Sequence, residues 1–220
     1  MPINRLRNIL STSYEVVIDS SNDTIRRVLA KVAQRAAARA RGGRRGGNAR
    51  PKSPAAVATL ANTQRLMVRP IDLLRKLGEL TTPPDVNMAK LNASWATRRY
   101  FWAISEPQGR APKFRLSEDA RKMDFHQKTL LSDEFGIGFG GFVLERLFGA
   151  YNSVDVSTAL KNPSQYQNIR QTGSAQPDYL MWSRDPNTPY YVVECKGCQT
   201  QRGAVMNQLR RGLEQVPSIQ

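Results

Sequence analysis

The sequence contains few of the side chains that build disulfide frameworks and most transition-metal sites. Its 220 residues include two cysteines and one histidine, too few for a disulfide-dense secreted scaffold or for a histidine-rich zinc site. No apolar run approaches the ~18 residues that a membrane-spanning helix needs, and no secretory signal pattern opens the chain. Hydrophobic residues make up 40% of the chain, enough for one core. We therefore expect a cytoplasmic protein without a membrane partner.

Negative charge is also scarce. Lys and Arg number 33 against 18 Asp and Glu, a net charge of +15, which favours a polyanionic partner. The excess is uneven, because residues 1–119 carry 22 basic and 9 acidic side chains whereas residues 120–220 carry 11 and 9. We therefore expect the first part to bind a polyanion and the second to perform chemistry that uses acids.

The composition divides the chain into three segments. Residues 1–56 are predicted to form a basic helix that begins near Asn22 and a flexible Arg/Gly linker. Clustered arginines bind phosphates by releasing counterions, and a solvated tail without such contacts is the alternative. The residues expected to contact nucleic acid are Arg26, Arg27, Lys31, Arg35, Arg39, Arg44 and Arg45.

The second segment, residues 57–116, is predicted to be mainly helical. Apolar periodicity indicates a helix over residues 63–80, which Pro70 can divide into two. Residues 95–104 fit either a strand or a short helix. Their aromatic and arginine side chains suit base stacking or, as we favour, a core cluster with arginines reaching the surface.

The third segment, residues 117–220, is predicted to begin with two helices. The first covers residues 117–131, and the second covers 133–148 with Ser132 as its N-cap. Glycines interrupt the second helix, and because glycine weakens a helix, they indicate a backbone packed very close to another element or a ligand. They also fit a GxGxxG dinucleotide fingerprint, but the preceding KTLLSDE is too polar for the buried strand that this motif requires. These glycines are Gly136, Gly138, Gly140 and Gly141.

A hairpin is predicted farther along this segment. Residues 178–182 and 190–196 are β-prone, and SRDPNTP between them has the composition of a turn. If the hairpin is centred on Pro186, facing residues have numbers that sum to about 372. Asp178 then lies opposite Glu194, with Cβ atoms roughly 4.5–5.5 Å apart. A slip of one residue would separate the two carboxylates.

The end of this hairpin gathers two carboxylates and an ammonium. Side chains alternate along a strand, so Glu194 and Lys196 share one face while Cys195 points away from it. Paired carboxylates are hard oxygen ligands that suit Mg²⁺, and a lysine beside them can act on water or stabilise charge on a phosphate. A surface ion pair is the alternative interpretation. A zinc site built on Cys195 and Cys198 lacks further ligands.

These residues resemble a known motif. Pro177-Asp178, followed by Glu194-Cys195-Lys196 sixteen residues after the aspartate, is similar to the PD-(D/E)XK motif of nucleases with the restriction-endonuclease-like fold. The resemblance covers roughly residues 117–216. It implies an α/β fold with an α-β-β-β-α core, preceded here by the mainly helical, basic N-terminal region.

The resemblance also implies roles for particular residues. Asp178, Glu194 and the backbone carbonyl of Cys195 would be Mg²⁺ ligands, with Mn²⁺ as a substitute. Lys196 would act at the attacking water, and Glu134 would be a further metal or water contact.

Two of the implied positions have alternatives. Glu145 is the alternative to Glu134 on the same helix. Many members of this family place a glutamine on the helix after the motif, which we assign to Gln208, ahead of Gln199 and Gln215.

The implied function is Mg²⁺-dependent endonucleolytic hydrolysis of DNA, in a setting such as restriction or antiviral defence against phage, with RNA left open as a substrate. The family core ends with a strand that this sequence does not show. A homodimer or a partner chain that completes the sheet is therefore one expectation, and a truncated nuclease is another. The alternatives are a non-catalytic nucleic-acid-binding or assembly subunit and a basic RNA-binding protein.

Overall fold

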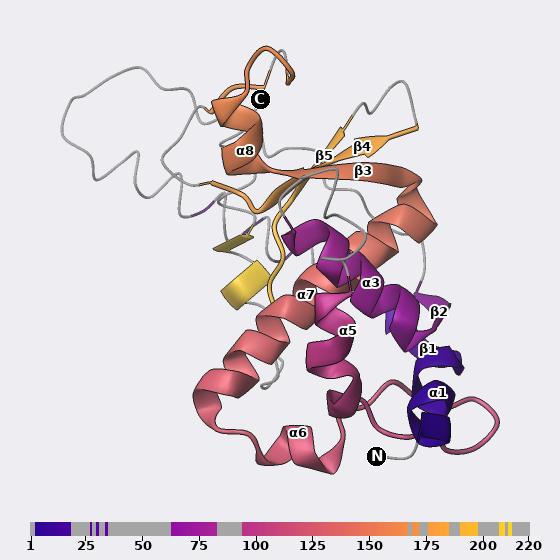
Figure 1. The fold of residues 1–220 in the computed structure, drawn as a ribbon. Coiled ribbons are helices and arrows are strands. Elements are labelled where there is room, and N and C mark those ends of the chain that lie inside the picture. Colours follow the sequence, from indigo (N-terminus) through magenta and orange to yellow (C-terminus); the bar gives the residue numbers. More distant parts are fainter. Residues whose placement is uncertain are drawn as a thin grey trace.

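Helices and two small antiparallel sheets make up the part of the chain that the structure describes (Figure 1), so the α/β class is confirmed. The computed structural model describes residues 3–18, 63–82, 94–166, 169–171, 176–184, 190–197, 207–209 and 211–212, with Arg27, Ala30 and Gln34. In chain order its elements are α1 (Ile3–Ser11), β1 (Tyr14–Ile18), β2 (Gln64–Val68), α3 (Pro70–Thr81), α5 (Trp95–Tyr100), η1 (Phe101–Ala103), α6 (Glu118–Lys122), α7 (Phe125–Phe148), β3 (Ala150–Asp155), α8 (Val156–Lys161), β4 (Tyr179–Ser183) and β5 (Tyr190–Val193).

The helix predicted over residues 63–80 is wrong in its first part. Residues 64–68 form β2, which pairs antiparallel with β1 from Tyr14↔Val68 onward. Helix α3 begins only at Pro70. Proline has no N–H to lose in the first turn of a helix, and it keeps the preceding Arg69 extended, with φ −83° and ψ 131°.

The boundary predicted at Ser132 is also wrong. Two caps lie earlier: the hydroxyl of Ser117 accepts from the N–H of Ala120 (3.1 Å), and the carboxylate of Asp124 accepts from the N–H of Gln127 (3.0 Å). The first helix therefore stops at Lys122, and α7 runs from Phe125 to Phe148 with Ser132 inside it. Residues 95–104, left open between strand and helix, form α5 and η1.

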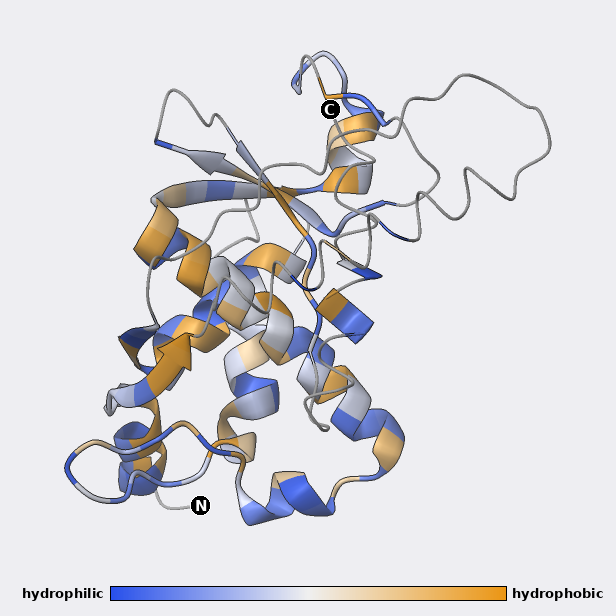
Figure 2. Cartoon of the chain, turned by 180° about the vertical axis from the view of Figure 1, so that it is seen from behind, coloured by the Kyte–Doolittle hydropathy of each residue, from blue (hydrophilic) through white to orange (hydrophobic). Residues whose placement is uncertain are grey.

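Residues on both sides of position 116 share one hydrophobic core. Helix α3 packs against both α7 and α5. Hydrophobic residues dominate the C-terminal turns of α7, whereas α6 is mainly hydrophilic (Figure 2), with Ala120 as its buried residue. The buried members of this core are Ile9, Tyr14, Leu74, Leu77, Ala96, Tyr100, Ala103, Ile104, Ala120, Leu131 and Phe135.

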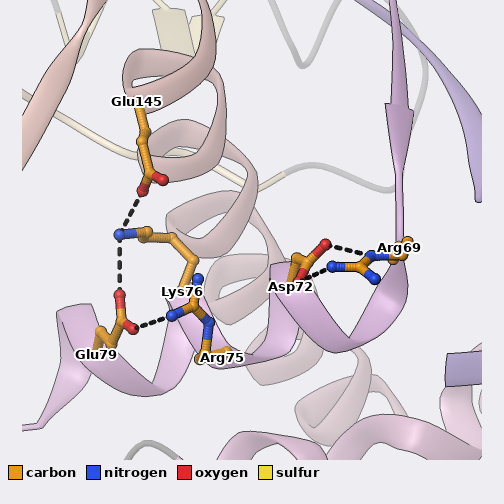
Figure 3. A network of polar contacts seen from close by, with 6 residues as sticks. All are labelled: Arg69, Asp72, Arg75, Lys76, Glu79 and Glu145. Atoms are coloured by element: carbon orange, nitrogen blue, oxygen red, sulfur yellow. Dashed lines mark hydrogen bonds and ion pairs between the residues drawn. The ribbon is translucent and has the colours of Figure 1, made fainter. Parts of the chain in front are cut away.

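An ion-pair network joins α3 to α7 (Figure 3). The ammonium of Lys76, 12% exposed, contacts Glu145 of α7 at 2.6 Å and Glu79 of α3 at 2.9 Å, and Arg75 contacts Glu79 at 3.3 Å. Burial lowers the pKa of Lys76, but the hydrogen bonds and charges of the two glutamates outweigh it, so the pKa is raised and the lysine stays charged. Glu145 is thus engaged with α3.

The second sheet follows directly on α7 and has the strand order β3-β4-β5, antiparallel throughout. In the β4–β5 hairpin, Tyr179 pairs with Val193 and Trp182 pairs with Tyr190. Each pair sums to 372, so the register predicted from the sequence is confirmed.

Leu77 is the residue of α3 on which the contact with α7 depends. It is fully buried, and a Cβ atom added at Gly138 would lie 3.1 Å from the Leu77 Cβ. We expect Leu77→Ala to lower the free energy of unfolding by about 2–5 kcal/mol, because it leaves a cavity between the two helices. Urea denaturation measures this loss. Met67→Ala, at an exposed position of β2, is the control with an expected change of about 0.5 kcal/mol; equal losses would contradict this packing.

Candidate active site

Asp178 lies at the end of the β4–β5 hairpin. Beyond the last ladder pair, its N–H donates to the carbonyl of Val193 at 3.1 Å. Its carboxylate accepts a hydrogen bond from the N–H of Cys195 at 2.7 Å. The hairpin therefore brings Asp178 beside the segment Glu194–Lys196, as the register predicts.

Glu194 and Lys196 share one face of this segment. The ammonium of Lys196 pairs with Oε1 of Glu194; the glutamate side chain is 3% exposed and the lysine side chain 33% exposed. Burial raises the pKa of Glu194, and the charge of Asp178 adds to this, whereas Lys196 opposes it. Burial therefore disfavours the charged form of Glu194, and the ammonium of Lys196 lies beside it.

Cys195 points the other way, into the interior. A Cβ atom added at Gly140 of α7 would lie 3.1 Å from its sulfur. Burial, with the charges of Asp178 and Glu194, raises the pKa of Cys195 to about 12. A thiol that stays protonated is a poor nucleophile, so we assign the contribution of Cys195 to its backbone.

The glycines of α7 let the helix approach this segment closely. A Cβ atom at Gly136 would lie 2.8 Å from the backbone nitrogen of Gly197, and one at Gly197 would collide with the Ser132 carbonyl. Gly138 and Gly141 face α3 instead, against Leu77 and Leu80. The interpretation of these glycines as sites of close backbone packing is confirmed.

Glu134 lies on α7 between the helix positions that touch the hairpin segment. Its charge acts on two buried tyrosine hydroxyls: with burial as the larger cause, it raises the pKa of Tyr100 and contributes to the raised pKa of Tyr179. Asp178 also raises the pKa of Tyr179. Glu134 and Asp178 therefore face the same region from different elements.

The residues after the motif approach Glu194 from another side. Residues 207–209 and 211–212 are helical. Gly212 is buried, and a Cβ atom there would lie 3.1 Å from Cγ of Glu194. Gln208, one turn earlier, has a buried side-chain oxygen. A helical segment therefore covers Glu194 and carries Gln208.

Unsatisfied buried oxygens are concentrated in this region. In the part of the chain that the structure describes, the buried side-chain oxygens without a hydrogen-bond partner belong to Tyr100, Glu134, Glu194 and Gln208, where Glu194 Oε1 has only its ion pair with Lys196. Each such group costs about 1–3 kcal/mol, and more when it is charged. Folded proteins satisfy most buried polar groups, so these atoms indicate a place where water, a cation or a ligand supplies what the chain does not.

The donor set decides which cation fits. Across the described ranges, no three His, Cys, Asp or Glu side chains are grouped so that they could hold a metal ion. Mg²⁺ keeps several waters and needs only one or two protein carboxylates, so Asp178 and Glu194, with the Cys195 carbonyl, fit it.

Several sequence-predicted residues lie away from this site or outside the described ranges. Glu145, the alternative to Glu134, is held by Lys76. Arg27 is exposed and helical. The remaining predicted contacts lie outside the described residues: Arg26, Lys31, Arg35, Arg39, Arg44, Arg45, Gln199 and Gln215.

The sequence reasoning missed Tyr100 as a member of the site. It assigned the tyrosine to a core cluster, which is where the ring lies, but gave no partner for the hydroxyl. A buried tyrosine hydroxyl normally finds a hydrogen-bond partner. The sequence could therefore have indicated that the Tyr100 hydroxyl needs a partner. Only the packing of α5 against α7 identifies Glu134 as its neighbour.

Comparison with known proteins found no matching family model, no matching curated protein and no matching solved structure. No helix among the described residues combines the length and apolar character needed to cross a membrane. Function therefore rests on the geometry of the site.

The contact between Gly136 and Gly197 is testable by adding one methyl group. We expect Gly136→Ala to lower the free energy of unfolding by up to about 2 kcal/mol, because a backbone collision of about 1–3 kcal/mol offsets the gain of about 1 kcal/mol in helix propensity. Gly140→Ala is the matched control, since its methyl meets only the Cys195 sulfur. Urea denaturation compares the two, and a Gly136→Ala protein as stable as the control would show that the helix does not need this glycine.

Glu194 is expected to reduce stability while no ligand is bound. We expect Glu194→Gln to raise the free energy of unfolding by about 1 kcal/mol at pH 7 in EDTA, because it removes a buried, poorly satisfied charge. The exposed Lys196 can regain water. Chemical denaturation measures the change, with Glu79→Gln on α3 as a control that loses less than about 1 kcal/mol. A loss above about 1 kcal/mol in Glu194→Gln would mean that the ion pair is a net stabiliser.

Proposed function

We propose that this protein is a Mg²⁺-dependent endonuclease that hydrolyses phosphodiester bonds in DNA, with a site of the PD-(D/E)XK type. The observation that carries the proposal is the position of the unsatisfied buried oxygens. Glu134, Glu194 and Gln208 were assigned to the site from the sequence, and all three retain such atoms. Because folded proteins pair most buried polar groups, these atoms support a site that a ligand or water completes.

The order of elements supports the same proposal. Helix α7 precedes the three strands β3, β4 and β5, with α8 between β3 and β4, and the helical residues 207–209 and 211–212 follow them. We infer that these elements are the α-β-β-β-α core of a restriction-endonuclease-like fold. The close approach of α7 and of Gly212 to the hairpin end supports a site enclosed by the two helices.

Each side chain at the hairpin end has a role in this proposal that follows from its charge and position. Mg²⁺, held by Asp178, Glu194 and the Cys195 carbonyl, would supply Lewis acidity toward the scissile phosphate. The N–H of Cys195 fixes the carboxylate of Asp178, and Glu194 orients the ammonium of Lys196. That ammonium is partly exposed, so it can reach a phosphate and stabilise the negative charge that grows on its oxygens.

Glu134 and Gln208 act on water and orientation in this proposal. The free Oε2 of Glu134 can accept a hydrogen bond from an attacking water and hold it in line with the phosphate. The amide oxygen of Gln208 can accept a hydrogen bond from the same water. Each role uses an atom that has no other partner in the described residues.

A second candidate is a nucleic-acid-binding or assembly subunit that has this fold and does not cut. The observation that favours it is the lack, among the described residues, of a cluster of three metal-ligating side chains. The net charge of +15 suits both candidates, so cleavage is the property that separates them.

The decisive experiment incubates the purified chain with supercoiled plasmid DNA in Mg²⁺ or in EDTA. We expect the plasmid to be nicked and linearised in Mg²⁺ and to stay supercoiled in EDTA. Asp178→Ala, Lys196→Ala and Glu134→Gln should each lower the rate about 100-fold or more. Glu145→Gln, which removes a charge from the same helix as Glu134, should cut within about twofold of the wild type, because Glu145 is engaged with Lys76.

Three results would contradict the nuclease proposal. Cleavage that survives in Asp178→Ala and Lys196→Ala would assign the activity elsewhere. Equal losses in Glu134→Gln and Glu145→Gln would remove Glu134 from the site. A folded wild type that binds DNA without cutting it would favour the second candidate, and a parallel assay on structured RNA tests the alternative substrate.

A further inference from the structure

Arg99 on α5 is an exposed cation that two aromatic rings hold in place. Its guanidinium carbon lies 5.2 Å from the ring centroid of Tyr100 and 5.9 Å from that of Trp95. The two rings meet edge to face, at 6.2 Å and 64°. Stacking on rings restricts a side chain that is otherwise flexible, so Arg99 is oriented before any partner arrives.

Among the described residues, no acidic side chain forms an ion pair with this guanidinium. On α3 and just before it, by contrast, Arg69 and Arg75 contact Asp72 and Glu79 (Figure 3). An exposed, ordered and unpaired arginine has its N–H donors available for an external anion.

Tyr100 connects Arg99 to the candidate active site. The Tyr100 ring packs edge-on against Phe135, at 5.6 Å between centroids, and Phe135 follows Glu134 on α7. The Arg99 guanidinium therefore lies against a ring that packs on the neighbour of Glu134.

The rings themselves are not available for stacking on bases. Tyr100 is buried and lies against Phe135 and Trp95, and the Arg99 guanidinium contacts both Trp95 and Tyr100. What α5 presents to a ligand at this point is the charged fork of the arginine. Such a fork matches the geometry of a phosphate, to which it can donate two parallel hydrogen bonds.

We propose that Arg99 binds a backbone phosphate of the nucleic-acid substrate next to the phosphate that is cut, and so sets the position of the strand relative to Glu134. This inference rests on the proposed nuclease function and adds a substrate-positioning residue to it. Arg99 is a binding residue here and takes no part in bond cleavage. Its contact is independent of base sequence, because it is made to the backbone.

Two methionine variants test the proposal, since methionine retains an apolar stem that can cover the rings while removing the charge. Arg98 is the matched control: it neighbours Arg99 on α5 and is exposed, but it stacks on neither ring. Binding of a labelled DNA duplex is measured by fluorescence anisotropy in EDTA at several salt concentrations, and cleavage is measured in Mg²⁺.

For Arg99→Met we expect about tenfold weaker binding and a slope of log K against log salt that is smaller in magnitude by about 0.9, the value for one lost phosphate contact. KM should rise with kcat unchanged within a few-fold. For Arg98→Met the slope should stay at the wild-type value. Arg99→Lys should restore the slope while regaining only part of the affinity, because an ammonium lacks the planar fork.

Two outcomes would overturn the proposal and are distinguishable. If the wild type binds and cuts DNA but both methionine variants change binding and slope equally, Arg99 contributes only general charge, and the nuclease proposal survives without it. If the wild type neither binds nor cuts DNA, the proposed function and this inference fail together. Thermal melting of each variant shows whether a loss of binding reflects a loss of folded protein.

Discussion

The backbone contact between α7 and the segment Glu194–Gly197 is the constraint on which the candidate site depends. Gly136 and Gly197 meet with no room for a methyl group on either residue. This distance brings Glu134, on the helix, toward the carboxylates at the hairpin end. With any larger side chain between them, the helix and the strand would stand farther apart, and the acidic groups would each be solvated separately. Van der Waals contact between two backbones therefore sets the electrostatics of the site.

The electrostatics in turn explain why the site is poorly satisfied. Burial raises the pKa of Glu194, and Asp178 adds negative charge beside it, while Glu134 and Gln208 keep oxygens without hydrogen-bond partners. In a stable fold, polar side chains at such positions are expected to have hydrogen-bond partners or to be exposed to water. Proteins depart from this expectation mainly where the unsatisfied groups receive a ligand, and the clustering of the exceptions is more informative than any one of them.

The sequence predicted the hairpin and its register because both depend on local signals. The alternation of side chains and the turn composition place Asp178 opposite Glu194, and the pairing of Tyr179 with Val193 agrees. It failed at residues 64–68 and at Ser132, where helical periodicity continued past the true boundaries. Pro70 and pairing with β1, about 50 residues earlier in the chain, set the first boundary. The cap at Asp124 sets the second. The neighbour of the Tyr100 hydroxyl was beyond the reach of the sequence for another reason: it depends on a contact between α5 and α7 that no local pattern encodes.

The shared core across position 116 has a consequence for how this chain can change over generations. Tyr100 belongs to the part before the motif-bearing region and Phe135 to the part within it, yet the two rings are in contact. A substitution at one alters the packing of the other, and with it the placement of both Glu134 and Arg99. We therefore expect the two segments to have been inherited as a unit, with compensating changes across their boundary.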